Sequence, residues 1–126
     1  MPVVRVSGLP QAPEVDLGVV LKRLCLRLAE LDGVDASRWW ATWQPIAPEA
    51  YFEGDAQAPP TQPRDTHPPL VEILAFVGRD PMLVERLLTA TCEVLADGLG
   101  TDPGNVLATW TDLLPGRVST GGSVRR

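Results

Sequence analysis

Residues that commonly carry catalysis or bind metals are scarce in this chain of 126 residues. It has one histidine, His67, and two cysteines, Cys25 and Cys92. Structural and catalytic metal sites gather several such ligands at short spacing, and that spacing is missing here. A serine or cysteine hydrolase would depend on His67 alone, without a nucleophile elbow. We therefore expect no metal and no cofactor, and we set zinc and serine-hydrolase chemistry aside.

Positive charge and long apolar runs are also lacking. The formal net charge is −5 and the pI is about 4.7, so we expect neither nucleic acid nor an anionic membrane as a partner. No apolar run approaches the roughly 18–20 residues of a membrane span. The first residues, MPVVRVSGLP, lack the positive n-region and the long apolar h-region of a signal peptide. These features favour a cytoplasmic protein.

The remaining composition is ordinary for a folded domain. Hydrophobic residues make up 44% of the chain and charged residues 21%, and the length suits a single domain, 1–126. Both cysteines lie in segments with helical apolar spacing. Free thiols that behave as small hydrophobic residues are the expected state, with a disulfide as the alternative.

An internal repeat divides the domain into two halves. At an offset of 67 residues, and without a gap, residues 2–54 fall on residues 69–121 with thirteen identities. The identities include rare residues, because Cys25 matches Cys92 and Trp43 matches Trp110. We interpret residues 2–54 and 69–121 as two pseudo-repeats joined by a linker, 55–68, whose Pro- and Ala-rich sequence disfavours regular structure.

Each half has the pattern strand, helix, strand. The segments 2–7 and 69–77 are short, β-branched and apolar, as buried strands are. Apolar residues then recur at helical spacing over 17–31 and 84–99. Asp80 and Pro81 form a helix start, and Gly33 and Gly100 stand where a left-handed C-cap is expected. The segments 39–46 and 105–114 are strand-like again.

These elements predict an α+β fold in which two tandem β-α-β repeats form a four-stranded mixed sheet with two helices on one face. The crossover within each repeat makes its two strands parallel. The other face of the sheet then needs cover. We place four tryptophans on the strands of that face, and so much exposed aromatic surface predicts a homotrimer: Trp39, Trp40, Trp43 and Trp110.

Three marks of the sequence resemble the tautomerase superfamily, the group of 4-oxalocrotonate tautomerase and macrophage migration inhibitory factor. The chain begins Met-Pro-Val-Val, it has Gly78-Arg79-Asp80 at a strand-to-helix turn, and it ends in the glycine-rich segment 115–122. The resemblance covers the chain apart from the linker, and it implies a trimer of β-α-β units with a proline exposed by removal of Met1.

The resemblance also implies a site. Pro2 would be the catalytic residue, because a terminal proline is a secondary amine that can accept and return a proton near neutral pH. Arg79 would hold a substrate carboxylate or stabilise an enolate oxygen, and a solvated arginine is the alternative. Four further residues are candidates for substrate binding, with packing at a subunit contact as the alternative for each: Tyr51, Phe52, Trp40 and Arg117.

Three functions remain open at this level. The first is a tautomerase that uses the Pro2 amine as general base or acid on a small keto, enol or unsaturated carboxylic acid. The second keeps Pro2 protonated for hydration, dehalogenation or decarboxylation. The third is a ligand-binding or structural trimer without catalysis, since β-α-β-β-α-β also describes ferredoxin-like sensors.

Overall fold

The computed structural model describes residues 1–126 as eight strands, two α-helices and two 3-10 turns. The four strands of the main sheet are β1 (Pro2–Gly8), β2 (Trp40–Pro45), β5 (Leu70–Phe76) and β6 (Leu107–Leu113). The helices are α1 (Leu17–Asp32) and α2 (Pro81–Leu99). The short elements are η1 (Ala36–Arg38), η2 (Pro48–Ala50), β3 (Phe52–Glu53), β4 (Ala56–Gln57), β7 (Ser119–Thr120) and β8 (Ser123–Val124).

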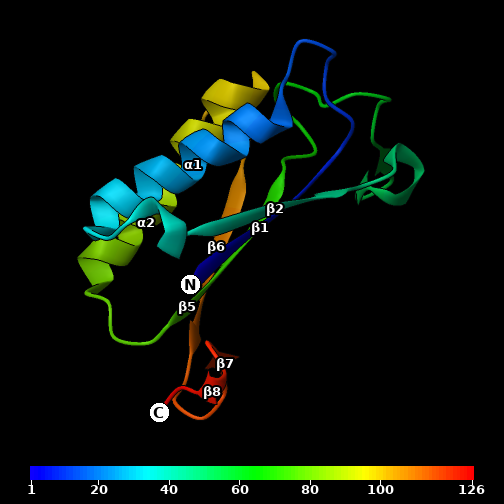
Figure 1. Ribbon diagram of the computed structural model, residues 1–126. Helices are drawn as coiled ribbons and strands as arrows, with labels where there is room; N and C mark the ends of the chain where they lie inside the picture. The colour runs from blue at the N-terminus through cyan, green and yellow to red at the C-terminus, as the bar shows by residue number, and fades with distance from the viewer.

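The main sheet has the strand order β2-β1-β5-β6. Strand β1 runs parallel to β2, and β5 runs parallel to β6, as a crossover helix between them requires. The two halves meet where β1 pairs antiparallel with β5, with Pro2 opposite Ala75 and Ser7 opposite Leu70. Figure 1 shows both helices on the same face of this sheet. The predicted fold class and mixed sheet are therefore confirmed.

Caps at both ends position the helices. The Asp16 carboxylate accepts a hydrogen bond from the backbone N–H of Val19, and Asp80 does the same for Met82. Gly33 and Gly100 end the helices with a φ of 71° each, which a residue with a side chain rarely adopts. The predicted helix start at Asp80-Pro81 and both predicted C-caps are confirmed.

The core lies between the sheet and the helices. On β1 every second residue from Pro2 to Gly8 is buried, and this face meets Leu24 and Leu28 of α1 and Leu87 and Leu95 of α2. The helices approach each other closely at Gly98, because a Cβ atom there would lie 2.8 Å from Cγ2 of Val20.

The tryptophans do not lie where the sequence placed them. Only Trp40 is on the open face, with 48% of its surface exposed. Trp39 is buried, and Trp43 and Trp110 pack against the core on the helical side. The prediction of four tryptophans on the open face was therefore wrong for three of them. The side chain of a strand residue follows the two-residue alternation, and Trp40 and Trp43 are three positions apart on β2.

A two-stranded hairpin follows the last long strand of each half. Strands β3 and β4 follow β2, and β7 and β8 follow β6, with matching registers 67 residues apart. Figure 1 shows the β7–β8 hairpin below the start of β1, with the teal β3–β4 segment at the opposite end of the sheet. The linker 55–68 thus contains β4 near its start, and its residues 58–68 contain no helix or strand.

The cysteines and the helices were both subjects of predictions from the sequence. Both cysteines are free thiols, each partly buried, and burial raises the pKa of both, with Glu93 adding to the effect at Cys92. Neither helix combines the length and the apolar character that crossing a lipid bilayer requires.

Candidate active site

Pro2, the first residue of strand β1, lines a pocket at this end of the sheet. Its ring is fully buried and faces the helices. The pocket has a volume of about 300 Å³ and is formed by both halves of the chain. Its lining comes from the chain start, the end of α1, the η1 turn, the β5–α2 turn and the C-terminal segment: Met1, Pro2, Asp32, Val34, Arg38, Phe76, Val77, Gly78, Arg79 and Arg125.

A buried ion pair forms one wall of this pocket. Arg79 donates from Nε to Oδ1 of Asp32 at 3.0 Å and from Nη2 to Oδ2 at 2.8 Å. The Asp32 side chain is 5% exposed and that of Arg79 21%. The remaining nitrogen, Nη1, faces the carbonyl oxygen of Phe76 at 3.4 Å. Because two nitrogens on one edge of the guanidinium contact Asp32 and the third faces Phe76, this arginine is held in one orientation.

Two tryptophans hold the ion pair. The Arg79 guanidinium lies 5.9 Å from the ring centroid of Trp39 and 5.9 Å from that of Trp110. Trp39 also donates from its indole N–H to Oδ2 of Asp32 at 3.1 Å. This cluster connects the end of α1 to the turn between β5 and α2, so it fixes the two halves of the pocket relative to each other.

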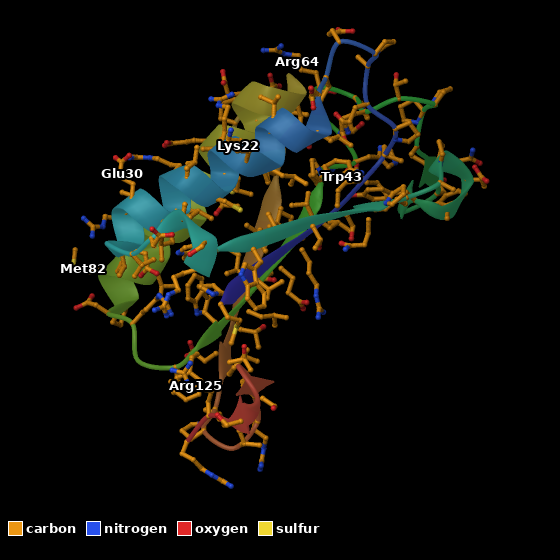
Figure 2. The ribbon with its side chains drawn as sticks, viewed as in Figure 1. Lys22, Glu30, Trp43, Arg64, Met82 and Arg125 are labelled. Atoms are coloured by element: carbon orange, nitrogen blue, oxygen red, sulfur yellow. The ribbon has the colours of Figure 1, made fainter.

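Two other arginines stand at the pocket without an acidic partner. Arg38 ends the η1 turn, and Arg125 follows β8; neither takes part in an ion pair. The Arg125 guanidinium lies 5.4 Å from the ring centroid of Phe76. Its backbone N–H donates to the carbonyl oxygen of Val118, and its own carbonyl accepts from Gly116. Figure 2 shows Arg125 where the sheet meets the β7–β8 hairpin.

The pocket charges act on its titratable groups. Partial burial lowers the pKa of the Met1 amine, and the positive charges of Arg38, Arg79 and Arg125 lower it further, while Asp32 opposes them. Burial by itself would raise the pKa of Asp32. The hydrogen bonds and charge of Arg79, with the bond from Trp39, outweigh that effect and lower it. With three cations and one carboxylate, the pocket is positive and suits an anion.

The structure brings two of the predicted site residues together, Pro2 and Arg79. Tyr51 and Phe52 lie at the opposite end of the sheet, because Tyr51 directly precedes the β3–β4 hairpin and Phe52 is its first residue. The Tyr51 hydroxyl donates to the carbonyl oxygen of Pro68 at 2.6 Å, and Phe52 is exposed.

Trp40 and Arg117 also lie outside this pocket within one chain. Trp40 pairs with Val3 in register, so its side chain points to the open face of the sheet, away from Pro2. Its indole N–H donates to the carbonyl oxygen of Ser37. Arg117 belongs to the turn between β6 and β7 and does not line the pocket.

Three charged residues of the pocket were missed by the sequence analysis: Asp32, Arg38 and Arg125. Asp32 and Arg38 are close in the chain, at the end of α1 and in η1, whereas Arg125 lies 93 residues after Asp32 and comes close to them only in the folded chain. One signal was available. At the offset of 67 the three correspond to Leu99, Asn105 and Ala58, so a search for charges present in only one half would have included them, together with others such as Lys22 and Arg27.

Comparison with known structures gives extensive matches at low sequence identity. Native fused 4-OT aligns with a TM-score of 0.84 and 15% identity over 97% of this chain and 94% of that one. A macrophage migration inhibitory factor-like protein from Entamoeba histolytica has a TM-score of 0.74 and 14% identity, over 98% and 97%. N1, a member of the cis-3-chloroacrylic acid dehalogenase family, has a TM-score of 0.74 and 18% identity, over 98% and 83%.

The chain has the tautomerase-superfamily fold. The resemblance drawn from its sequence is thus confirmed at the level of the fold. No protein-family model matches the sequence, and no curated protein does. In this tautomerase fold the pocket around Pro2 combines an arginine predicted from the sequence with three charged residues that the structure adds.

Proposed function

We propose that this protein, once Met1 is removed, is a tautomerase that acts on a small keto, enol or unsaturated carboxylic acid. The observation that carries the proposal is that Pro2 lines a pocket together with three arginines and one aspartate. Removing Met1 turns the Pro2 nitrogen from an amide into a secondary amine. That amine takes a proton from the carbon next to the substrate carbonyl and returns it elsewhere, which moves the double bond.

The electrostatics of the pocket support a basic amine. Burial and the three arginines lower the pKa of the Met1 amine, and Pro2 is more deeply buried than Met1 in the same field. The depressed pKa leaves more of the amine unprotonated at neutral pH, as a general base requires. The developing negative charge of the enolate is stabilised by the neighbouring guanidinium groups.

A second chemistry has one observation in its favour. Asp32 raises the pKa of the terminal amine, and a protonated Pro2 would serve as the acid in hydration, dehalogenation or decarboxylation of an unsaturated or β-keto acid. The rate–pH profile separates the two. Activity that rises with pH as the amine loses its proton supports the base, and activity that falls supports the acid.

We also propose that the chain forms a homotrimer through the open face of its sheet. This face exposes Trp40, Leu70 and Leu107, and the Arg5–Glu72 ion pair lies on it. A fused 4-OT of similar fold is described as a symmetric trimer. Tyr51, Phe52, Trp40 and Arg117 remain candidates for the pocket of a neighbouring subunit. Light scattering of the purified protein tests the trimer, and a monomer would contradict it.

The test of the function begins with the intact mass, which shows whether Met1 is removed. A tautomerase assay with phenylenolpyruvate or 2-hydroxymuconate then compares the wild type with Pro2→Ala. We expect activity to fall about 10²- to 10⁴-fold, the usual contribution of a general acid or base. The matched control is Pro69→Ala, since the Pro69 nitrogen lies in a peptide bond, and we expect its activity to stay within about twofold of wild type. Retained Met1, or a wild type without activity, would leave the third function, a non-catalytic trimer. Equal losses in both variants would contradict the role of the Pro2 amine as the base.

A further inference from the structure

The three arginines of the pocket are not equivalent, and the difference lies in what each contacts. Asp32 occupies Nε and Nη2 of Arg79, and the carbonyl of Phe76 faces Nη1. A carboxylate ligand would have to displace a 5%-exposed aspartate to use the same fork. Separating such a buried pair is unfavourable, because it leaves one charge without a partner. Arg79 is thus poorly available to a ligand.

Arg38 and Arg125, in contrast to Arg79, are available to a ligand. Both line the pocket, both are exposed to solvent, and neither forms an ion pair with an acidic side chain. Arg125 is nevertheless held in place, because its backbone is hydrogen-bonded on both sides and its guanidinium lies against the Phe76 ring. A guanidinium with free donors and a fixed backbone is suited to bind a carboxylate.

The other half of the chain supports this division. The position equivalent to Arg38 is Asn105, whose amide donates to the carbonyl of Thr66, and the position equivalent to Arg125 is the buried Ala58. The backbone around both is similar, since the Ala58 N–H donates to the carbonyl of Tyr51 as the Arg125 N–H donates to Val118. The fold therefore accepts neutral residues at both positions, and the arginines occur only where Pro2 lies.

We propose that Arg38 and Arg125 bind the carboxylate of the substrate, and that Arg79 does not, because Asp32 withholds it from the ligand. This inference rests on the proposed function for the identity of the ligand as a substrate. The net charge of the pocket follows from it: the Asp32–Arg79 pair is neutral, and the two remaining guanidinium groups select a small anion.

The test uses butyrate, a small carboxylate without a reactive double bond, and butyramide as its neutral analogue. Isothermal titration calorimetry on the protein of confirmed intact mass measures the dissociation constant. We expect the wild type to bind butyrate, more weakly at high salt, and not to bind butyramide. Arg38→Ala and Arg125→Ala should each weaken butyrate binding about tenfold. The matched control Arg126→Ala removes the neighbouring charge and should leave binding unchanged.

The role of Arg79 is tested in a variant that leaves neither charge of the ion pair without its partner. The double variant Asp32→Asn with Arg79→Gln removes both charges of the pair, and we expect its butyrate dissociation constant to stay within about twofold of wild type. Loss of binding in this variant, with normal binding in Arg38→Ala and Arg125→Ala, would overturn the inference. So would the absence of butyrate binding in the wild type.

The two proposals fail separately. Pro2→Ala should bind butyrate as the wild type does while losing catalysis. If the wild type has no tautomerase activity but binds butyrate through Arg38 and Arg125, the function is wrong and the carboxylate site stands. If activity depends on Pro2 but neither arginine variant changes the KM or the butyrate dissociation constant, the function stands and the assignment of the arginines is wrong.

Discussion

Pro2 and Pro69 lie 67 residues apart: Pro2 begins strand β1, and Pro69 directly precedes strand β5. The sheet ends beside them have similar backbones and different side chains. Four charged residues surround Pro2, and the positions equivalent to them hold neutral ones. The pairs are Asp32 and Leu99, Arg38 and Asn105, Arg79 and Ala12, and Arg125 and Ala58. Because the sheet end beside Pro69 folds without these charges, the fold does not require them. We therefore attribute the charges to the candidate active site around Pro2.

The end beside Pro69 is instead covered by the linker. The Gln62 amide donates to the carbonyls of Pro63 and His67, and the Asn105 amide donates to Thr66. The buried His67 ring contacts the edge of Tyr51 at 5.1 Å between centroids. The polar side chains there are thus bonded to the backbone of the linker, whereas two guanidinium groups at the Pro2 end are free.

The largest effect is expected from breaking the ion pair. Asp32→Asn leaves the Arg79 charge without its carboxylate and should lower the free energy of unfolding by about 3 kcal/mol at neutral pH. Leu99→Ala, at the equivalent position, should cost about 2–3 kcal/mol through a cavity. Urea unfolding of both variants at neutral pH gives these values.

The pH dependence separates the two variants. The pKa of Asp32 in the folded protein lies below its ordinary 3.8, so its stabilisation is complete above pH 3.8 and is lost as the pH falls through the folded-state value. The deficit of Asp32→Asn should therefore shrink in urea unfolding below pH 3.8, while that of Leu99→Ala should not. A constant Asp32→Asn deficit would show that charge is not its cause.

A smaller effect is expected at the other end of β1. A Cβ atom on Gly8 would lie 2.5 and 2.7 Å from Cη2 and Cζ2 of Trp43, a residue that Figure 2 labels on β2. The equivalent position in the second half is Ala75, and its tryptophan, Trp110, lies against Arg79 instead. Gly8→Ala should lower the free energy of unfolding by about 1–3 kcal/mol.

A double-mutant cycle checks the cause of that loss. In a Trp43→Leu background the ring is gone, and Gly8→Ala should then be close to neutral in thermal unfolding. An equal loss in both backgrounds would assign the effect to the backbone of Gly8.

The smallest effect is a shift of the rate–pH profile. Arg38 lowers the pKa of the Met1 amine, and we expect the same effect on the Pro2 amine that removal of Met1 exposes. Arg38→Gln should therefore raise the pKa of the Pro2 amine and move the acid limb of the tautomerase profile to higher pH. Asp32 has the opposite sign, and Asp32→Asn should move the limb to lower pH. Arg64→Ala is the control from the other end of the sheet, where Arg64 pairs with Asp102 at 2.8 Å, and it should leave the limb in place.

The elements of the fold could be predicted because they depend on local patterns. Apolar periodicity indicated both helices, Asp80 and Gly33 marked their ends, and the crossover rule gave the parallel pairs. The faces of the tryptophans could not be read in the same way. Trp39 directly precedes β2, so its burial depends on the η1 turn rather than on the strand, and Trp110 turns toward Arg79 of a different element.

The site was predictable only where a motif is local. Pro2 and Arg79 belong to short sequence motifs at the start of the chain and at one strand-to-helix turn. Arg38 and Arg125 belong to no such motif, and their meeting depends on sheet pairing and on a hairpin that returns the chain to the β5 end. Contacts between residues distant in the sequence are set by packing, which a single sequence does not display.

The position of Arg79 between Trp39 and Trp110 gives the protein an intrinsic optical reporter. Indole fluorescence responds to nearby charge, and the rings of Trp39 and Trp110 face the ion pair. The other two tryptophans, Trp40 and Trp43, lie on β2. An event that separates Asp32 from Arg79 changes the charge beside both rings, and Trp39 additionally donates to Oδ2 of Asp32. The emission spectrum of the unlabelled protein therefore distinguishes a ligand that leaves the ion pair intact from one that opens it.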